Sequence, residues 1–267
     1  MVYWKEGKKT RKKLERIINN GNLFISDLDE TLNKRPSIME FMLKGMGYAV
    51  SRENCDFAFN YFKKNFEFFI RTLIMESPVF NNKKEQMKNS LSYDSVNFAN
   101  SLPEKMKKIY SGKVSSLYSG VEELIGLISR DFESMVIISD GLNEIKNNYV
   151  ARLKPYIEKG TNFWSEEVPY IVLEDGRIST KVNKKRYFVE RVIYSDIIGK
   201  PEGVLVFGNG GSDSQMVGLL HEVIGKENVF VAGMNPKDQL FREYCDIYVT
   251  QSWIPFLKEY KKIKQKH

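Results

Sequence analysis

Short apolar runs alternate with amphipathic stretches in the first part of the chain and in its second half. Compact apolar runs next to turn residues predict buried strands at 23–26, 135–138, 203–207, 229–232 and 247–249. Apolar residues spaced three and four apart predict helices at 8–18, 121–128, 142–153 and 184–194, and a further helix that Ser212 begins as its cap. Strands that alternate with helices predict an α/β fold, with a mostly parallel sheet covered by helices on both faces.

The segment between the first two strands has a different pattern. Pro36 breaks the α/β rhythm, and from residue 37 to about residue 116 the chain looks helical. One apolar stripe there is unusually aromatic: Phe59, Phe62, Phe66, Phe69 and Leu73. We therefore predict an inserted helical domain at 34–116, with 1–33 and 117–267 forming the α/β core. A hairpin is predicted at 170–180, where Glu174-Asp175-Gly176 supplies the turn.

Composition narrows the class of protein. Hydrophobic residues make up 42% of the 267 positions, which excludes a mainly disordered chain. No apolar run approaches the ~18 residues of a membrane span, and the basic start of the chain lacks the apolar centre of a signal peptide. Two cysteines, Cys55 and Cys245, do not make a disulfide framework and read as packing residues. We expect a cytoplasmic protein without a membrane partner.

The net charge of +7 raises the question of a nucleic-acid partner. Much of this charge lies in two basic runs, at residues 5–16 and 258–266, which are typical of the solvated faces of terminal helices. No nucleic-acid-binding signature accompanies them, so we expect no nucleic-acid partner. His221 is likewise expected on the surface of the helix after Ser212. A mild positive field remains suited to an anionic substrate.

Two carboxylates follow the first predicted strand, in the sequence Asp27-Leu28-Asp29-Glu30-Thr31. The carboxyl ends of parallel strands are where α/β sheets bind ligands. Paired carboxylates suit a cation and an anionic substrate, because one ligates while the other handles a proton. Taken alone, the pair is equally consistent with a turn whose carboxylates cap the next helix.

Polar residues at three later positions favour the ligand-binding interpretation. Ser139 ends the second core strand, and the Asp140 and Gly141 amides lie near a helix start that attracts anions. Lys184 and Lys185 open a helix and can present an ammonium group to phosphate oxygens. Asn209 and Asp213 follow a later strand and can help to hold a divalent cation.

In their order and spacing these motifs resemble the haloacid dehalogenase (HAD) superfamily of phosphohydrolases, over nearly the whole chain. The family pattern is Asp-x-Asp-x-Thr, a strand ending in Ser or Thr, a Lys, and Gly-Asp-x-x-x-Asp. The helical insert and the hairpin are similar to the type 1 cap of the phosphoserine-phosphatase-like branch. The resemblance implies a Rossmann-like core with a cap domain, and Lys185 is favoured over Lys184 because Phe188 and Val189 follow it in the usual helix pattern.

The resemblance also implies a mechanism. Asp27 would attack phosphorus to form an aspartyl-phosphate, and Asp29 would act as general acid and then as general base. Ser139, Asp140, Gly141 and Lys185 would bind the phosphate, and Thr31 would brace the turn. Mg²⁺ would be the cofactor, held by Asp27, Asp29, Asn209 and Asp213. The expected partner is a small phosphorylated metabolite; oligomeric state is not predicted.

Two departures from the family pattern leave alternatives open. Asn209 stands where the metal loop normally has Asp. Three consequences are open: Asp213 compensates for the missing charge, the metal binds more weakly, or Asn209 deamidates next to Gly210. We favour a fourth, in which Asn209 itself serves as a metal ligand. Pro36 stands where phosphoserine phosphatases place a specificity Glu, which disfavours phosphoserine as substrate. A phosphotransferase of the same branch and a catalytically impaired phosphate-binding relative are the alternatives to a phosphatase.

Overall fold

The computed structural model divides the chain into two compact units. Met1–Arg35, Ser115–Glu167 and Asn183–His267 form the first, and Pro36–Val114 with Val168–Val182 form the second. The residues that the structure describes are 2–34, 116–139, 149–165, 171–172, 178–179, 184–194 and 200–266. The aromatic stripe of the predicted inserted domain lies outside these residues, so that domain stays a prediction. The second unit contributes the antiparallel strands β5 (Ile171–Val172) and β6 (Ile178–Ser179), which fall within the predicted hairpin.

A seven-stranded sheet forms the centre of the first unit, with the strand order β1-β9-β8-β7-β2-β3-β4. Its strands in chain order are β1 (Val2–Trp4), β2 (Leu23–Asp27), β3 (Ser134–Ile138), β4 (Asn162–Ser165), β7 (Val204–Gly208), β8 (Val229–Met234) and β9 (Ile247–Val249). All neighbours pair in parallel except β1, which runs antiparallel to β9. The predicted α/β fold with a mostly parallel sheet is confirmed.

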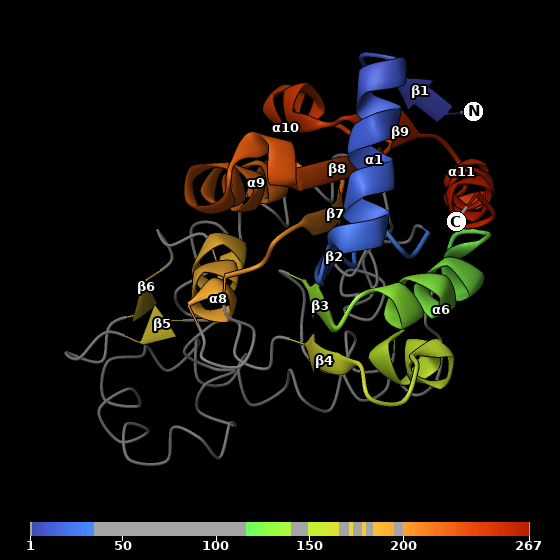
Figure 1. Ribbon diagram of the computed structural model, residues 1–267. Helices are drawn as coiled ribbons and strands as arrows, with labels where there is room; N and C mark the ends of the chain where they lie inside the picture. Colours follow the sequence, from blue (N-terminus) through green and yellow to red (C-terminus); the bar gives the residue numbers. More distant parts are fainter. Residues whose placement is uncertain are drawn as a thin grey trace, which may run out of the picture. The chain divides into compact units, whose positions relative to one another are not determined.

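Helices cover both faces of this sheet (Figure 1). They are α1 (Lys8–Asn20), α6 (Val121–Asp131), α8 (Lys184–Ile193), α9 (Gly211–Ile224), α10 (Gln239–Tyr244) and α11 (Ile254–Lys264), with short 3₁₀ turns η2 (Lys154–Tyr156) and η3 (Lys226–Asn228). Residues 149–153 are also helical. Helices α8, α9 and α10 lie on one face, and α1, α6 and α11 lie on the other. In the described part of the chain, no helix combines the length and apolarity that crossing a bilayer requires.

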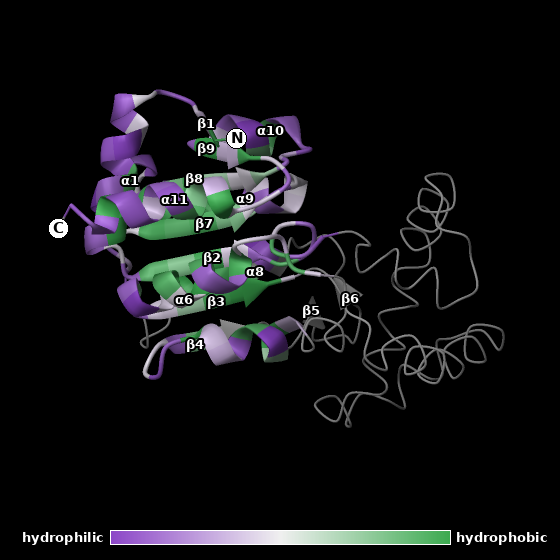
Figure 2. Cartoon of the chain, turned by 90° about the vertical axis from the view of Figure 1, so that its right-hand side faces the viewer, coloured by the Kyte–Doolittle hydropathy of each residue, from purple (hydrophilic) through white to green (hydrophobic). Residues whose placement is uncertain are grey.

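Side-chain alternation along the central strands explains these two layers. Leu23 and Ile25 of β2 pack in one apolar cluster with residues of α8 and α9. Phe24 points to the other face, where its ring meets Phe207 edge-on at 4.9 Å. Phe207 in turn stacks on Trp253 at 4.1 Å, just before α11. Because the central strands are buried on both faces of the sheet, most of their residues are apolar, as Figure 2 shows.

The chain order of the strands positions the candidate site. From β2 the chain moves to β3 and β4 on one side, and then returns to β7, β8 and β9 on the other side of β2. The carboxyl ends of β2 and β7 therefore border a topological switch point, where open α/β sheets have their ligand crevice. Asp27 is the last residue of β2, and Asn209 follows the last residue of β7.

The five predicted core strands agree with the observed ones to within two residues at each end, but three sequence expectations need correction. Strands β1 and β4 were not expected, because one is a three-residue edge strand and the other mixes polar and aromatic residues. Ser212 is not the cap of α9: Gly210 is, and Ser212 lies inside the helix. His221 is partly buried rather than on the helix surface, and its ring packs edge-on against Tyr244 at 5.3 Å.

Candidate active site

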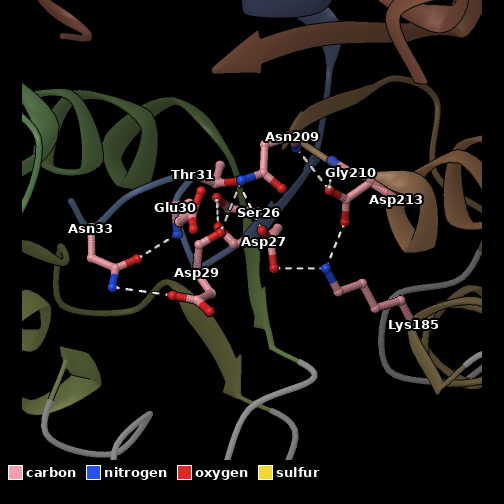
Figure 3. A network of polar contacts seen from close by, with 10 residues as sticks. All are labelled: Ser26, Asp27, Asp29, Glu30, Thr31, Asn33, Lys185, Asn209, Gly210 and Asp213. Atoms are coloured by element: carbon pink, nitrogen blue, oxygen red, sulfur yellow. Dashed lines mark hydrogen bonds and ion pairs between the residues drawn. The ribbon is translucent and has the colours of Figure 1, made fainter. Parts of the chain in front are cut away.

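Asp27 is a buried carboxylate at the carboxyl end of the sheet, with 3% of its surface exposed. Its Oδ1 accepts a hydrogen bond from Lys185 Nζ at 2.7 Å, and its Oδ2 accepts one from Thr31 Oγ1 at 2.8 Å. Thr31 lies one helical turn after Asp27 in sequence, so its hydroxyl reaches back to the carboxylate (Figure 3). Both oxygens of Asp27 are thus held in a fixed orientation.

Lys185 lies between two carboxylates, as Figure 3 shows. Its Nζ donates to Asp27 at 2.7 Å and to Asp213 Oδ1 at 2.7 Å, and the residue is 3% exposed. The lysine comes from the second position of α8, which packs against α9, the helix that carries Asp213. Lys185 is therefore the lysine that the structure places in this site; the side chain of Lys184 is outside the described residues.

Asp213 ties the loop after β7 to the start of α9. Its Oδ2 accepts hydrogen bonds from the backbone N–H groups of Asn209 at 2.8 Å and Gly210 at 3.0 Å. Gly208 permits this arrangement, since a Cβ there would lie only 2.8 Å from Asp213 Oδ2. The glycine at the end of β7 is thus required by close packing. Asp213 takes on the capping role that the sequence had assigned to Ser212.

The turn after Asp27 is held by Asn33, a buried residue that the sequence analysis did not select. The carboxamide of Asn33 accepts from the Glu30 N–H at 2.8 Å and donates to Asp29 Oδ1 at 3.4 Å and to the Tyr149 hydroxyl at 3.2 Å. Glu30 adopts a left-handed conformation with φ of 57°, so the turn needs such support. Asn33 thereby connects the Asp29 carboxylate to a fully buried tyrosine far away in sequence.

Trp253 fixes the same turn from the other side. Its indole N–H donates to the backbone carbonyl of Thr31 at 2.8 Å, and its ring is fully buried against Phe207. Trp253 thus positions the residue that holds Asp27 Oδ2. Nothing in the local sequence marks Trp253 or Tyr149 for this role, because each reaches the turn from a distant segment. Asn33 is close in sequence, but its spacing matches no motif that we used.

Asn209 contacts the turn through its side chain. The side-chain Nδ2 of Asn209 donates to the backbone carbonyl of Asp29 at 3.2 Å. The backbone carbonyl of Asn209 accepts from the Lys237 N–H at 3.0 Å. Lys237 also forms an ion pair with Glu30, so two contacts join this loop to the turn. The hydrogen bond that engages the Gly210 N–H disfavours deamidation of Asn209, which requires that nitrogen to attack the Asn209 side chain.

The electrostatics of this cluster are unbalanced. One ammonium group, on Lys185, faces two buried carboxylates, on Asp27 and Asp213. Burial and the negative charge of Asp213 raise the pKa of Asp27, while Lys185 and the Thr31 hydroxyl lower it; the net result is a pKa of about 8. A buried site with one carboxylate too many is suited to a bound cation, which would restore the ionised form of Asp27.

The donor atoms fit Mg²⁺ better than a transition metal. Among the described residues, no group of three or more His, Cys, Asp or Glu side chains could hold a metal ion. The site instead offers the carboxylate of Asp27, the carbonyl of Asp29 and the carboxamide of Asn209. Mg²⁺ is commonly bound by only one or two carboxylates and keeps several waters. The Asn209 carboxamide and the Asp29 carbonyl already lie side by side, since Asn209 Nδ2 donates to that carbonyl at 3.2 Å.

The remaining predicted site residues are placed only in part. Ser139 is 2% exposed and directly follows Ile138, which is the register partner of Asp27 across β2 and β3. Asp140 and Gly141 lie outside the described residues, so their predicted phosphate-binding role stays a prediction. The structure therefore brings together Asp27, Asp29, Lys185, Asn209 and Asp213, with Ser139 on the neighbouring strand.

No protein-family model and no curated protein matches the sequence. Solved structures do match it. Cytosolic 5′-nucleotidase IIIB bound to cytidine aligns over 100% of this chain and 94% of its own, with 13% identity and a TM-score of 0.56. Phosphoserine phosphatase in its apo form aligns over 89% and 98%, with 17% identity and a TM-score of 0.48. A family IA HAD hydrolase from Entamoeba histolytica aligns over 91% and 99%, with 10% identity and a TM-score of 0.46.

Of these three structures, the 5′-nucleotidase alone exceeds a TM-score of 0.5, so the fold comparison rests on it. At 13% identity it establishes a common fold and no shared activity. The chain therefore shares its Rossmann-like α/β fold with this 5′-nucleotidase, and Asp27 lies at the switch point of its sheet.

Proposed function

We propose that this protein is a Mg²⁺-dependent HAD-type phosphatase that hydrolyses a small phosphorylated metabolite. The observation that carries the proposal is the buried cluster in which Lys185 joins Asp27 and Asp213 with two 2.7 Å contacts at the carboxyl end of β2. A purely structural ion pair has no need of a second carboxylate, of a hydroxyl holding the first one, or of a place at the switch point.

The proposed hydrolysis has two steps, in which Asp27 is the nucleophile and Asp29 the general acid and base. Asp27 attacks phosphorus, an oxygen–phosphorus bond forms, and the bond to the leaving alcohol oxygen breaks as Asp29 donates a proton to that oxygen. Asp29 then takes a proton from the water that cleaves the aspartyl-phosphate, which releases inorganic phosphate and restores Asp27. Asn33 orients the Asp29 carboxylate, and Thr31 orients that of Asp27.

Lys185 and Ser139 would bind the phosphoryl oxygens, together with the amides of Asp140 and Gly141. An ammonium group in a water-poor site stabilises the developing negative charge much more strongly than it would in water. The Mg²⁺ ion would be held by Asp27, the Asp29 carbonyl and Asn209, with Asp213 behind them, and would offset the repulsion between carboxylate and phosphate. Its charge also favours the ionised, nucleophilic form of Asp27 at neutral pH.

Substrate choice would lie with residues 34–116, which we propose as a helical cap of the phosphoserine-phosphatase-like branch. Pro36 in place of the specificity Glu disfavours phosphoserine itself. The structural neighbour with the TM-score of 0.56 is a 5′-nucleotidase bound to cytidine, which makes nucleoside monophosphates an appropriate part of a substrate panel. A cytoplasmic location with no nucleic-acid or membrane partner remains part of the proposal.

One observation favours a second candidate, a catalytically impaired phosphate-binding relative. Asn209 donates a hydrogen bond to the carbonyl of Asp29, so a neutral amide occupies part of the space that a metal would share. If this amide replaces the ion, Asp27 stays protonated at neutral pH and is a poor nucleophile. Nothing specific favours a phosphotransferase, which an acceptor alcohol would reveal by yielding a new phosphoester.

The deciding experiment is phosphate release from an aryl phosphate and from a panel of sugar phosphates and nucleoside monophosphates, with Mg²⁺ and with a chelator. Asp27→Asn removes the nucleophile and keeps the shape of the side chain. Asp131→Asn is the matched control, because it makes the same change at the end of α6, outside the candidate site, where Asp131 pairs with Lys264 and accepts a hydrogen bond from Tyr260.

The proposal predicts Mg²⁺-dependent release that Asp27→Asn reduces by at least about a thousandfold, the scale of losing a catalytic nucleophile, while Asp131→Asn keeps it. Release that survives in Asp27→Asn would point to another nucleophile or to a contaminant. No release at any Mg²⁺ concentration, combined with saturable binding of phosphate by folded protein, would establish the impaired relative instead.

A further inference from the structure

A second concave site lies away from the candidate active site, and none of the active-site residues lines it. It has a volume of about 550 Å³ and is bordered by α1, by η3 and by residues 243–246, at the end of α10 and just after it. Figure 1 shows α1, α10 and β9 near the edge strand β1. Pockets for small molecules typically occupy about 300–1,000 Å³, so a ligand as large as a nucleotide fits this volume.

The lining of this basic pocket is dominated by cations: Lys5, Lys9, Lys12, Lys13, Arg16 and Lys226. Four of them lie on α1, at spacings that place them on one side of the helix. Like charges three and four residues apart destabilise a helix by a few tenths of a kcal/mol per pair unless a counter-charge is present. Without counter-charges, the row of cations on α1 therefore destabilises this helix.

Counter-charges within the described residues satisfy only part of this set. Lys13 pairs with Asp246 at 2.8 Å, and Lys9 pairs with Glu6 at 3.3 Å. Lys5 and Arg16 donate instead to the neutral backbone carbonyls of Glu243 and Glu227, respectively. In the part of the chain that the structure describes, Lys12 and Lys226 form no ion pair. Four of the six cations therefore form no ion pair with a carboxylate of the described residues.

Acidic residues do not cancel the excess. Glu6, Glu227, Glu243 and Asp246 also line the pocket, which leaves two more positive than negative side chains. Neighbouring groups respond to this field. Burial, together with the charges of Lys13 and Lys226, lowers the pKa of His221 to about 4. The Nε2 of His221 is buried without a hydrogen-bond partner among the described residues, so the imidazole adds no charge to the pocket.

We propose that this basic pocket binds a small polyphosphate anion, such as tripolyphosphate or the phosphate chain of a nucleotide. A compact chain of phosphates extends from the cationic face of α1 to Lys226 on η3 and replaces the missing counter-charges on both. A single carboxylate or monophosphate satisfies fewer of the four cations and binds more weakly. The site is separate from the proposed phosphatase chemistry and does not depend on it.

The test is calorimetric titration of the full chain with tripolyphosphate at constant ionic strength. Lys12→Ala/Lys226→Ala removes two exposed cations of the pocket lining, one on α1 and one on η3, that form no ion pair with the described residues. Lys200→Ala/Lys258→Ala is the matched control, since both residues are exposed and lie outside the pocket. Asp27→Asn, measured in parallel, reports any binding at the candidate active site.

We expect saturable binding that Lys12→Ala/Lys226→Ala weakens by about tenfold or more, equivalent to about 1.4 kcal/mol, and that the control and Asp27→Asn leave unchanged. Equal weakening by the control would show a general charge effect and overturn the proposal. Unchanged affinity in Lys12→Ala/Lys226→Ala, or no saturable binding at millimolar tripolyphosphate, would also overturn it. Tighter binding of a single-stranded oligonucleotide that needs the same lysines would replace the small anion by a nucleic acid.

Discussion

Two lysine–aspartate pairs in this protein, one buried and one partly buried, have almost the same contact distance and different surroundings. Lys185 contacts Asp27 at 2.7 Å near the carboxyl end of β2, and Lys13 contacts Asp246 at 2.8 Å between α1 and β9. The Lys13 ammonium spans both oxygens of Asp246, one of which also accepts from the Val231 N–H at 2.9 Å. That pair is balanced, one charge to one charge, and it anchors α1 to the sheet.

The Asp27 pair is unbalanced because Lys185 is shared with Asp213. Its side chains are about 4% exposed, whereas Lys13 and Asp246 are each 16% exposed. Burial raises the pKa of both aspartates, and for Asp27 the second carboxylate adds to that effect. A balanced pair is complete without a ligand, but an unbalanced, drier one gains from a cation and from an anion that the lysine can hold. The comparison therefore indicates that the Lys13–Asp246 pair stabilises the fold, whereas the Lys185–Asp27 pair is suited to binding and chemistry.

The largest expected effect comes from removing each lysine in turn. Lys185→Met should lower phosphate release by about 100- to 1,000-fold, because a preorganised charge that faces the transferring phosphoryl group is lost. Lys13→Met should instead lower the free energy of unfolding by about 1.5–3 kcal/mol, the value of hydrogen bonds to charged groups, with kcat kept where the protein is folded. Steady-state kinetics and denaturant unfolding of both variants would measure this contrast. Loss of activity in Lys13→Met at full folding would contradict it.

The second prediction concerns the pH dependence of stability in metal-free protein. Asp27 has a pKa of about 8 when folded and an ordinary value of 3.8 when unfolded, so the folded state keeps a proton between these limits. The protonated Asp27 therefore contributes fully to the free energy of unfolding below about pH 4. As the pH rises from about 4 to about 8 this contribution is lost, and the free energy of unfolding falls by up to about 1.4 kcal/mol per pH unit. Asp27→Asn should remove this slope, and Mg²⁺ should flatten it in the unmodified protein by favouring the carboxylate.

Urea unfolding at a series of pH values would measure this slope. The pKa of Asp246 is also raised on folding, but Asp246 is present in both proteins, so its effect cancels in the difference. Parallel stability curves for the unmodified protein and Asp27→Asn would mean that Asp27 is ionised throughout. The site would then be balanced by some other positive group.

The smallest expected effect sharpens the role of Asn209. Asn209→Asp adds a carboxylate beside the Asp29 carbonyl and should lower the Mg²⁺ concentration for half-maximal activity about tenfold, which corresponds to about 1.4 kcal/mol. Without metal the same change should destabilise the fold, because one more carboxylate joins Asp27, Asp29 and Asp213 in the cluster. Mg²⁺ titrations of activity and of melting temperature would measure both. A variant that melts lower in saturating Mg²⁺ than without it would show that Asn209 does not face the metal.

Local sequence was sufficient for most of the core. Runs such as residues 204–208 and 229–234 are apolar throughout, and only a strand buried on both faces has that pattern. It was insufficient for β1, whose three residues alternate in exposure and become a strand only by pairing with β9. It also misplaced the cap of α9, because both Ser212 and Asp213 are good N-terminal residues and only the contact with the Gly210 N–H separates them.

The sequence by itself determined the order of the strands and helices, the residue types of the site and their place at strand ends, since these follow from period, turn chemistry and motif spacing. Tertiary structure decided the rest. It placed Lys185 between Asp27 and Asp213 and formed the hydrogen bonds by which Asn33 and Trp253 support the turn after Asp27. It also placed the cations of α1 and Lys226 in the lining of one pocket. Each of these depends on residues distant in sequence meeting in space, and their burial and charge balance exist only once the chain has folded.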